Sequence, residues 1–470
     1  MKFTKFGKAL LVCALSVGVI FGVSSCIRSY TVGFFYVTGT VTAQSGNNGI
    51  ISGYKIDHNT GKLTPINGLP VSTGGANPVR AVLLTGSRFV YVLNRGTNSA
   101  GNGACTTADP CQNSNITQFA VGGNGVLTYQ ETFYTQGINP FRLIGDPSGN
   151  FLLALDHDSP SSAACGLALG SSVTACGDVT VFSVNQTTGR LSLIQNTAVT
   201  QANCPTSLIT CPLTYFPVPA NPIDFVLTSG YLLTLSGTPS SGDYVYPYAY
   251  SSSGGQLTLS QNAAQPLTNA SDGAGSCSDG VATSAPGLVD CATAIVSASS
   301  VIYVLDNEPI TGTTYGGSSV SSPSQILPFT VGTGGALQAD TGGIIPDDPT
   351  LSNPIYLMVE SKGKYLYVAN QGNDVTGNNP ESGIAAYTIY TSPAYQLGFV
   401  SDEPFGSGSG PQCIVEDPSN QFIYEANQYD STITGRVLDP TSGELDDMRS
   451  TSTYTLEGPP TWCFVDGRTG

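Results

Sequence analysis

The stretch ISGYKIDHNTGKL (residues 51–63) is an alternating strand followed by a Gly61-Lys62-Leu63 turn, and this combination recurs along the chain. Alternation with a period of two predicts a half-buried β-strand, and a glycine between two such segments predicts a tight turn. The first three turns lie 64 residues apart. The other copies are Gly125-Val126-Leu127, Gly189-Arg190-Leu191, Gly255-Gln256-Leu257, Gly335-Ala336-Leu337, Gly443-Glu444-Leu445 and the degenerate Tyr395-Gln396-Leu397.

A second pattern lies between consecutive turns and consists of a proline, an apolar strand, a tight turn and another apolar strand. It spans 140–155 around Pro147-Ser148-Gly149, and 354–369 around Lys362-Gly363. Each repeat therefore contains four short strands joined by hairpins. Such a long repeat with four strands is typical of a propeller blade, so the sequence predicts an all-β, seven-bladed β-propeller with four antiparallel strands per blade.

The two ends of the chain carry complementary parts of this pattern. Residues 460–466, PTWCFVD, copy the start of an inner strand, and residues 33–37, GFFYV, copy a second strand with no first strand before it. We therefore expect the N- and C-terminal segments to complete one blade together, which would leave no open sheet edge at the seam. The propeller is predicted to span 33–470.

The composition narrows the class of protein. Only 10% of the 470 residues are charged, and 56 Gly and 30 Pro oppose long helices. The 23 Tyr and 18 Phe can form a large core, which argues against disorder. A formal net charge of −16 argues against a nucleic-acid partner, because such binding needs clustered Lys and Arg. Two histidines cannot form a multi-histidine metal site, and we predict neither a metal nor a cofactor.

The N-terminal segment has the pattern of an export signal. Lys2, Lys5 and Lys8 precede an apolar run over 9–23, which is too short for a comfortable membrane span. The run ends in Val23-Ser24-Ser25-Cys26, which resembles the lipobox of bacterial lipoproteins, in which the cysteine is acylated. An ordinary signal peptide with an incidental cysteine is the alternative.

We therefore predict a lipoprotein signal peptide over 1–25 and a lipidated N-terminus with a short tether over 26–32. The membrane would be a partner through the lipid on Cys26. Ile27 and Arg28 follow this cysteine, without the aspartate that resembles an inner-membrane retention signal, so the outer membrane is the expected location.

Eight cysteines form pairs that are close in sequence and lie in Gly-, Ser- and Asn-rich stretches, where loops are expected. In an exported protein this pattern predicts disulfides. Zinc is the alternative, but no pair has Cys-x-x-Cys spacing. Cys413 and Cys463 lie where two adjacent blades begin at the predicted closure, and both a disulfide and free buried thiols are open there. The predicted pairs are Cys105–Cys111, Cys165–Cys176, Cys204–Cys211 and Cys277–Cys291.

The chain resembles the lactonase family of seven-bladed propellers over essentially its whole predicted mature length. The resemblance is sharpest from Gly49-Ile50 to Gly61-Lys62-Leu63, and from Asp417-Pro418-Ser419 through Asn427-Gln428 to Gly443-Glu444-Leu445. These are mostly hairpin and strand residues. They imply the fold and say little about chemistry.

The positions that carry catalysis in this family are occupied differently here. One family blade begins Pro-His-x-His ahead of Asp-Pro, whereas this chain has Asn139-Pro140-Phe141-Arg142. Another begins Pro-Arg-His and its strand ends in Asn-Glu, whereas this chain has Pro354-Ile355-Tyr356 and Asn370-Gln371. Lactone hydrolysis needs a base that activates water and a group that stabilises the oxyanion. Phe and Ile supply neither, so loss of the family chemistry is expected.

The tight turns of both patterns lie at one end of the propeller, so the cysteine pairs and the long connections share the other end. Long loops on a rigid scaffold are common places for binding sites. The residue two positions after each blade-opening proline is predicted to face the central mouth at that end, beside the ends of the second strands. The candidate residues are Arg80, Arg142, Asp224, Tyr356, Cys413, Trp462, Gln371, Asn427 and Gln428.

Two interpretations of this mouth remain open. Two arginines, an aspartate and two aromatic residues could hold an anionic or carbohydrate-like ligand, or they could form a self-compensated ring that stabilises the blade junctions. The segments 156–158 and 306–308 are rich in oxygen ligands, but neither has the spacing of a known calcium loop, and solvated strand ends are the alternative.

We therefore predict a non-catalytic protein that binds a small molecule, a carbohydrate or a protein through its loop face. The alternative is a 6-phosphogluconolactonase-like lactonase with relocated catalytic groups, for which Arg80, Arg142 and Asp224 are the candidates.

Overall fold

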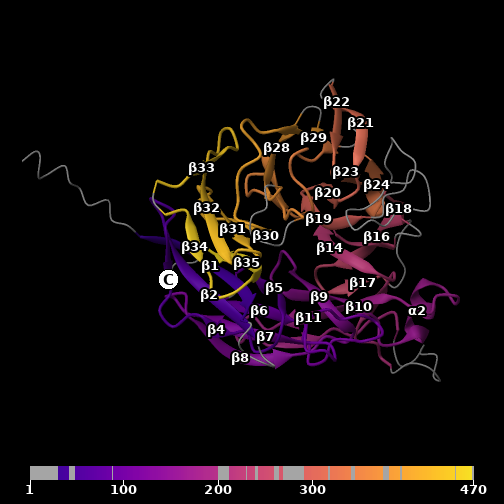
Figure 1. The fold of residues 1–470 in the computed structure, drawn as a ribbon. Coiled ribbons are helices and arrows are strands. Elements are labelled where there is room, and N and C mark those ends of the chain that lie inside the picture. The colour runs from indigo at the N-terminus through magenta and orange to yellow at the C-terminus, as the bar shows by residue number, and fades with distance from the viewer. Residues whose placement is uncertain are drawn as a thin grey trace, which may run out of the picture.

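The structure is a computed structural model that describes residues 30–41, 48–86, 88–199, 211–228, 230–238, 242–258, 264–267, 291–315, 318–339, 345–373, 381–391, 394–449 and 451–467. Seven sheets of four or five strands form a ring, and each sheet is one blade of a β-propeller (Figure 1). The innermost strand of each blade lies beside the innermost strands of its two neighbours. The predicted all-β, seven-bladed architecture is confirmed.

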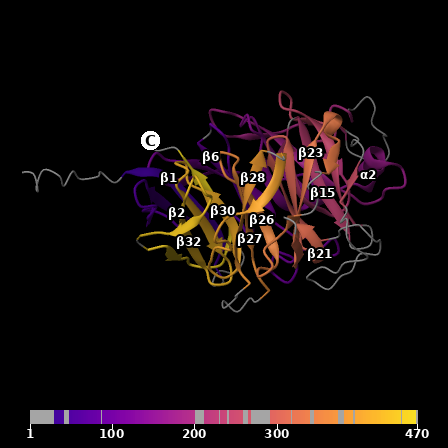
Figure 2. The ribbon, with the colours of Figure 1, turned by 90° about the horizontal axis from the view of Figure 1, so that it is seen from above.

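Blade 1 joins the two ends of the described chain. Strand β1 (Thr31–Thr40) pairs with β2 (Gly49–Asp57) on one side and with the innermost strand β35 (Pro460–Asp466) on the other. In Figure 1, and again from above in Figure 2, the yellow C-terminal strands lie against the indigo β1 and β2. The predicted closure is therefore confirmed.

Each blade runs from an innermost strand at the central axis to a short outer strand. Blade 1 is completed by β3 (Leu63–Pro65) and β4 (Val71–Ser72). Blade 2 contains β5 (Pro78–Leu83), β6 (Phe89–Asn94), β7 (Asn115–Val121) and β8 (Leu127–Phe133). Blade 3 contains β9 (Ile138–Gly145), β10 (Phe151–Asp158), β11 (Gly177–Val184), β12 (Leu191–Leu193) and β13 (Phe216–Val218). Blade 4 contains β14 (Pro222–Thr228), β15 (Tyr231–Thr238), β16 (Gly242–Ser251), β17 (Gln256–Leu257) and β18 (Gln265–Pro266).

The remaining blades repeat the plan. Blade 5 contains β19 (Ala292–Ala298), β20 (Val301–Asp306), β23 (Gln325–Val331), β24 (Leu337–Ala339) and β25 (Ile345–Pro346), with the 3-10 turn η1 (Thr333–Gly335) before β24. Blade 6 contains β26 (Pro354–Val359), β27 (Tyr365–Asn370), β28 (Gly383–Thr391) and β29 (Ala394–Phe399). Blade 7 contains β30 (Pro411–Glu416), β31 (Phe422–Asn427), β32 (Thr432–Leu438), β33 (Leu445–Asp447) and β34 (Thr453–Thr455).

Two local elements in the long connections were not predicted from the sequence. Helix α2 (Ser162–Leu169) lies between β10 and β11, and the hairpin β21 (Ile310–Tyr315) and β22 (Ser318–Ser322) lies between β20 and β23. The Ser161 side chain accepts a hydrogen bond from the Ala164 N–H and caps the helix. Along the described part of the chain, no helix has the length and apolar character that a membrane crossing requires.

The second strand of each blade is covered on both faces by its neighbours, which is why it is an apolar run. In β20, for example, every residue from Val301 to Asp306 is buried. A strand that is buried on both faces cannot show the alternating pattern of a half-exposed strand.

The recurring turn glycine fits against an aromatic ring of the preceding blade. A Cβ atom added at Gly189 in blade 3 would lie 2.4 Å from Phe89, the first residue of the second strand in blade 2. The same contact joins the other glycines of the series to the matching aromatic residue. These pairs are Gly61–Phe422, Gly125–Phe34, Gly255–Phe151, Gly335–Tyr231 and Gly443–Tyr365.

A buried tyrosine hydroxyl strengthens four of these junctions. Tyr91, two residues after Phe89, donates to the Gly189 carbonyl at 2.5 Å, and Tyr424 donates to the Gly61 carbonyl at 2.6 Å. Tyr36 and Tyr367 donate to Gly125 and Gly443 at 2.7 and 2.9 Å. The Gly-x-Leu turn is thus an inter-blade contact as well as a hairpin turn.

The closure between blades 7 and 1 is also covalent. Cys413 on β30 and Cys463 on β35 form a disulfide between the innermost strands of the two blades. Both side chains are buried, at 0% and 1% exposure. Of the two possibilities that the sequence left open, the disulfide is the one present, and Cys413 therefore does not face the mouth.

The turn contact predicts the effect of adding a methyl group. We expect Gly189→Ala to lower the free energy of unfolding by about 3 kcal/mol, because it adds a steric conflict with Phe89 to the cost of a left-handed alanine at φ 69°. Gly86→Ala is the matched control: Gly86 has φ 71° but no atom within 4 Å of an added Cβ, so only the backbone cost of about 1 kcal/mol is expected. Denaturant titration of both variants measures the difference, and equal losses would contradict the assigned contact.

Candidate functional site

The same backbone irregularity occurs near the start of every innermost strand. A register shift lies between the opening residue and the residue two positions later, for example between Pro78 and Arg80. The other six innermost strands, β9, β14, β19, β26, β30 and β35, show the same shift. A bulge of this kind redirects a side chain from the regular alternation of a strand. Six of the predicted mouth residues occupy this position, and all of them except the disulfide-bonded Cys413 lie close together.

Arg80, Trp462 and Tyr356 form a stacked group across the ring. The Arg80 guanidinium lies 3.7 Å from the centroid of the Trp462 ring. The Tyr356 ring, from blade 6, meets the same indole edge-on at 5.0 Å between centroids. The indole N–H donates to the Ala81 carbonyl at 3.1 Å and fixes the ring. A cation over an indole is the strongest of the common cation–π arrangements.

Arg142 and Asp224 form an ion pair beside this group. Arg142 Nε lies 3.2 Å from Asp224 Oδ1, with the side chains 22% and 14% exposed. The backbone N–H groups of Phe225 and Ile295 also donate to the Asp224 carboxylate, at 3.0 and 3.2 Å. The Asp224 carboxylate therefore already accepts hydrogen bonds from Arg142 and from two backbone N–H groups. Few of its acceptor positions remain for the other arginines.

Positive charge exceeds negative charge in this part of the mouth. Burial, and then the neighbouring Arg142, lower the pKa of Arg80 to about 9, although Asp224 acts in the opposite direction. Burial and Arg142 also lower the pKa of Arg95, which follows the second strand of blade 2. Arg142 thus acts on both other guanidinium groups, and among the described residues Asp224 is the carboxylate that pairs with this group. A bound anion would relieve this repulsion.

The opposite side of the mouth carries a chain of amide side chains. Asn353 donates to Gln371 Oε1 at 3.2 Å, and Gln371 donates to Gln428 Oε1 at 3.0 Å. Gln412 also donates to Gln428, and Asn307 donates to Asn353 at 3.2 Å. The structure thus brings the predicted residues Gln371 and Gln428 together. Asn307, from blade 5, had been singled out only as part of the oxygen-rich segment 306–308, and Gln412, from blade 7, had no distinctive signal in the sequence.

Asn427 does not join this group. It is fully buried, and its amide donates to Thr432 and Thr434 on the third strand of its own blade, at 3.1 and 3.0 Å. Its role here is to connect two strands of blade 7, because a buried amide requires partners of this kind.

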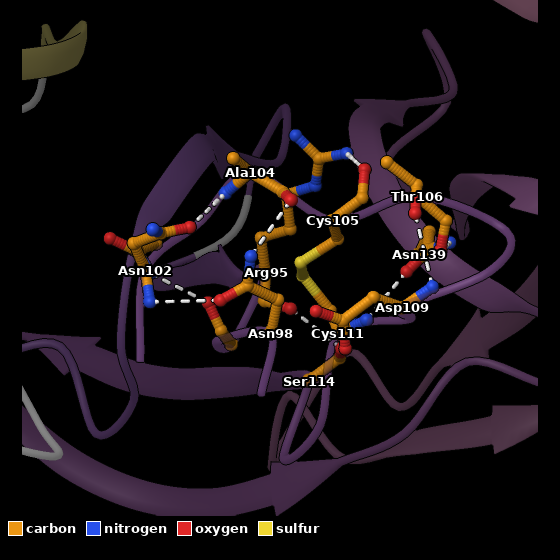
Figure 3. The surroundings of a disulfide bond; sticks show 12 residues. Arg95, Asn98, Asn102, Ala104, Cys105, Thr106, Asp109, Cys111, Ser114 and Asn139 are labelled. Atoms are coloured by element: carbon orange, nitrogen blue, oxygen red, sulfur yellow. Dashed lines mark hydrogen bonds between the residues drawn. A yellow bond between two sulfur atoms is a disulfide. The ribbon is translucent and has the colours of Figure 1, made fainter. Parts of the chain in front are cut away.

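The Cys105–Cys111 disulfide pins a loop of blade 2 against blade 3 (Figure 3). Asn139, the second residue of β9, accepts from the Cys111 N–H at 2.7 Å and donates to the Thr106 carbonyl at 3.2 Å. Arg95 donates to the Cys105 carbonyl at 3.4 Å from inside the loop. The pinned loop therefore holds both an arginine of the mouth and the residue that precedes the bulge of β9.

The other predicted disulfides agree with the structure where it describes them. Cys165 in α2 is bonded to Cys176, and the helix packs on Val199, Leu213 and Tyr215. Cys211 and Cys291 are also disulfide-bonded. Their predicted partners, Cys204 and Cys277, lie outside the described residues, as does Cys26.

A histidine–aspartate pair beside the mouth was not singled out as a catalytic candidate from the sequence. His157 Nδ1 lies 3.1 Å from Asp158 Oδ1, which leaves Nε2 as the nitrogen that can accept a proton. Its ring meets the Phe141 ring at 6.3 Å, and Phe141 in turn lies under the Arg142 guanidinium. Asn139 and Thr107 both donate to Asp158 at 2.8 Å and orient it. The Asp-His-Asp sequence was the available signal.

Comparison with known proteins identifies the family. The sequence matches the model of the family described as "Lactonase, 7-bladed beta-propeller" over residues 47–207 and 336–461, which is more than half of the chain. The chain belongs to this lactonase family. No curated protein matches the sequence.

Solved structures of similar fold cover nearly the whole propeller. A putative 6-phosphogluconolactonase from Bacteroides fragilis is 16% identical with a TM-score of 0.55, and the alignment covers 92% of this chain and 98% of the other. The periplasmic gluconolactonase PpgL from Pseudomonas aeruginosa is 16% identical with a TM-score of 0.56 and coverages of 92% and 99%. At this identity the likeness establishes the fold of this lactonase-family chain and not its substrate.

Close to the mouth, this family member carries a pair of buried carboxyl groups. Asp156 at the end of β10 and Asp178 at the start of β11 are cross-strand partners, and both are 0% exposed. Thr135 and Thr180 donate to Asp156 at 2.7 and 3.3 Å, but neither oxygen of Asp178 accepts a hydrogen bond of good geometry. The same position in blade 2 holds Asn94 and Asn115, where an amide donor meets a carbonyl acceptor at 2.9 Å. A proton shared by the two acids would supply the missing donor.

This pair predicts a pH-dependent stability. Burial raises the pKa of Asp156 to about 7, and burial together with the Asp156 charge raises the pKa of Asp178 well above its ordinary value. The folded state then holds more protons than the unfolded chain above about pH 4, so the free energy of unfolding should fall as the pH rises from about 4 to about 7. Asp158 and Tyr215 also act on Asp178, but neither brings a positive charge.

Asp178→Asn should therefore stabilise the protein by about 1–3 kcal/mol at pH 7 and flatten this part of the pH profile, since the amide can donate to Asp156. Asp446→Asn removes the same charge from an exposed position in β33 and serves as the control. Thermal unfolding from pH 4 to pH 8 measures both variants. A destabilised Asp178→Asn protein at pH 7 would show that the two carboxyl groups do not share a proton.

Proposed function

We propose that this lactonase-family protein is exported, is anchored by a lipid on Cys26, and binds a small hydroxylated anion at its central mouth without transforming it. The observation that carries the proposal is the mouth itself, in which three guanidinium groups accompany one satisfied carboxylate. An arginine binds a carboxylate or phosphate with charge-assisted hydrogen bonds, which are stronger than neutral ones. Burial strengthens them further, because water screens the charges less.

The amide side of the mouth complements the arginine side. Gln371, Gln428 and Gln412 present donors and acceptors without charge, which suits the hydroxyl groups of a sugar acid. Trp462 and Tyr356 offer apolar ring surface to the carbon skeleton of the same ligand. A polyhydroxy carboxylate would use both sides of the mouth.

Several substitutions support binding without hydrolysis. Where the family places an imidazole or a carboxylate, this chain has Phe141, Ile355, Tyr356 and Gln371. None of these residues is a base of suitable strength near pH 7. The one carboxylate of the arginine group, Asp224, accepts two backbone N–H groups and an arginine. Those contacts occupy the carboxylate oxygens that would have to accept a hydrogen bond from a water molecule.

One observation favours a second candidate function, lactone hydrolysis. The imidazole of His157 is oriented by Asp158 and lies beside Phe141 and Arg142. In that arrangement Nε2 would take a proton from water and the arginines would hold the developing oxyanion. Two structural neighbours, a periplasmic gluconolactonase and a putative 6-phosphogluconolactonase, are consistent with this alternative.

The binding proposal is tested with D-gluconate and with D-glucitol, which has similar hydroxyl groups but no charge. We expect gluconate to change the fluorescence of Trp462, the only tryptophan in the chain, and glucitol to have a much weaker effect. Arg80→Ala/Arg142→Ala should weaken gluconate binding by about tenfold or more. Arg190→Ala/Arg449→Ala removes the same charge from exposed positions and should bind like the parent protein. Equal affinity of both double variants would refute the anion site.

Hydrolysis is tested separately with δ-gluconolactone and 6-phosphogluconolactone. We expect no turnover above the spontaneous rate in buffer, because the family positions lack a base. Turnover that is lost in His157→Ala and retained in Arg190→Ala/Arg449→Ala would instead establish the second function and make the non-catalytic proposal wrong.

The anchor makes an independent prediction. Cysteine acylation at Cys26 would hold the processed protein in the membrane fraction, so Cys26→Ser should release it or leave the signal uncleaved. The confirmed disulfides are typical of an oxidising compartment outside the cytoplasm and support the export step. Fractionation of cells followed by mass measurement checks this. A Cys26→Ser protein that is processed and remains membrane-bound would contradict lipidation.

A further inference from the structure

The face opposite the mouth carries a hollow that results from two shortened turns. In blades 3 and 6 the hairpins between the first and second strands close with six-residue turns, after the pairs Gly145–Leu152 and Val359–Leu366. In blades 4 and 5 Thr228 pairs directly with Tyr231, and Ala298 pairs with Val301, so only two residues remain in each turn. The short turns of blades 4 and 5 thus lie between the longer turns of blades 3 and 6.

The space above the low turns forms two adjoining hollows. One has a volume of about 510 Å³ and is bordered by Pro147 and Ser148 of blade 3 and by Tyr231 of blade 4. The other, of about 460 Å³, is bordered by Ser361 and Lys362 of blade 6. Ser297 and Ser299 of blade 5 line both, so the hollows form one groove across four blades. Volumes of this size are typical of sites for small ligands.

The lining of the groove combines hydroxyl groups with a larger area of apolar surface. The hydroxyl-bearing residues include Ser148, Thr228, Ser252, Ser297, Ser299 and Ser361, and the apolar surface includes Leu227, Val359 and Ile389. Tyr231 packs on the Gly335 turn and Pro247 of the neighbouring strand, which holds the ring in place. The Tyr250 hydroxyl lies beside Asp146 without a hydrogen bond of good geometry.

The two carboxylates at the groove are already engaged in their own turns. Asp146 accepts from the N–H groups of Asn150 and Phe151, at 3.0 and 3.1 Å, and from the Ser148 hydroxyl at 2.8 Å. Glu360 accepts from the Lys362 N–H at 2.6 Å and from Asn420 at 3.2 Å. Neither offers a free charge to a cation. An anion would find Lys362 as the one basic residue among those that line the groove.

We propose that this groove binds a neutral oligosaccharide. Hydroxyl groups both donate and accept hydrogen bonds, as sugar hydroxyls require, while tyrosine and aliphatic surface suits the apolar faces of sugar rings. A groove that combines hydroxyl groups with apolar surface, and whose two carboxylates are engaged in their own turns, fits a chain of several sugars better than a charged metabolite. The site lies at the end of the propeller opposite the mouth and does not depend on the function proposed there.

The test uses calorimetry with neutral hexasaccharides of glucose, xylose, mannose and N-acetylglucosamine. At least one should bind the parent protein, and Ser148→Phe should weaken this binding by about tenfold by filling the groove at its blade 3 wall. Ser419→Phe is the matched control, because Ser419 occupies the same place in the Asp417-Pro418-Ser419 turn of blade 7 and also bonds its turn aspartate. It should bind within about twofold of the parent.

A second variant rebuilds the missing turn. Replacing residues 299–300 with the blade 7 sequence Asp-Pro-Ser-Asn-Gln-Phe, which this chain already folds at 417–422, should abolish hexasaccharide binding and leave the gluconate response of Trp462 unchanged. Absence of binding to every hexasaccharide, or equal binding by Ser148→Phe and Ser419→Phe, would overturn the proposal. Neither result bears on gluconate at the mouth, so the two proposals can fail separately.

Discussion

The contact between a turn glycine and an aromatic side chain of the preceding blade is the interaction on which the ring of seven blades depends. The glycine leaves room for Phe34, Phe89, Phe151, Tyr231, Tyr365 or Phe422, and its left-handed backbone is the conformation that glycine adopts without steric cost. At the junction of blades 5 and 6 the turn is the degenerate copy, and the matching position holds the smaller Val301. The two partners therefore change together along one chain, as a packing contact requires.

Because the contact repeats, the innermost strands start at equivalent positions around the axis. A bulge lies at the same position of each, and in blades 1, 2, 3, 4 and 6 the side chain at that position lies at the mouth. The identity of that residue is free to vary without loss of the blade, since the strand is held by its ladder and its buried face. Arg80, Arg142, Asp224, Tyr356 and Trp462 thus share one backbone geometry and differ only in chemistry. This explains how a family fold is kept while the residues that carry family chemistry are replaced.

The sequence was sufficient for the blades, the closure and the two loop disulfides for which the structure describes both cysteines, because each rests on local patterns that recur. The mouth residues could be named because the bulge follows the opening proline at a fixed distance. Gln371 and Gln428 were predicted at the mouth, but their connection to Asn307, Asn353 and Gln412 was not, since the members of this amide chain come from three blades and have no common spacing. Asn427 was predicted at the mouth for a related reason, because a side chain at the end of a second strand can also face the interior of its own blade, as the Asn427 side chain does. His157 lacked a visible partner until β9 and β10 brought Phe141 beside it.

The turns opposite the mouth show how a repeat protein can gain a surface feature by losing residues. A two-residue hairpin and a six-residue hairpin both satisfy the strand ladder, so the shorter turns of blades 4 and 5 cost the sheet little. They do change the shape of this end of the propeller. The longer turns of blades 3 and 6 project beyond them, and each is fixed by hydrogen bonds from its N–H groups to its own carboxylate, Asp146 or Glu360. A hollow between rigid walls retains its shape without a ligand, which lowers the entropic cost of binding. The same ring that positions the mouth therefore also makes the opposite face a preformed surface.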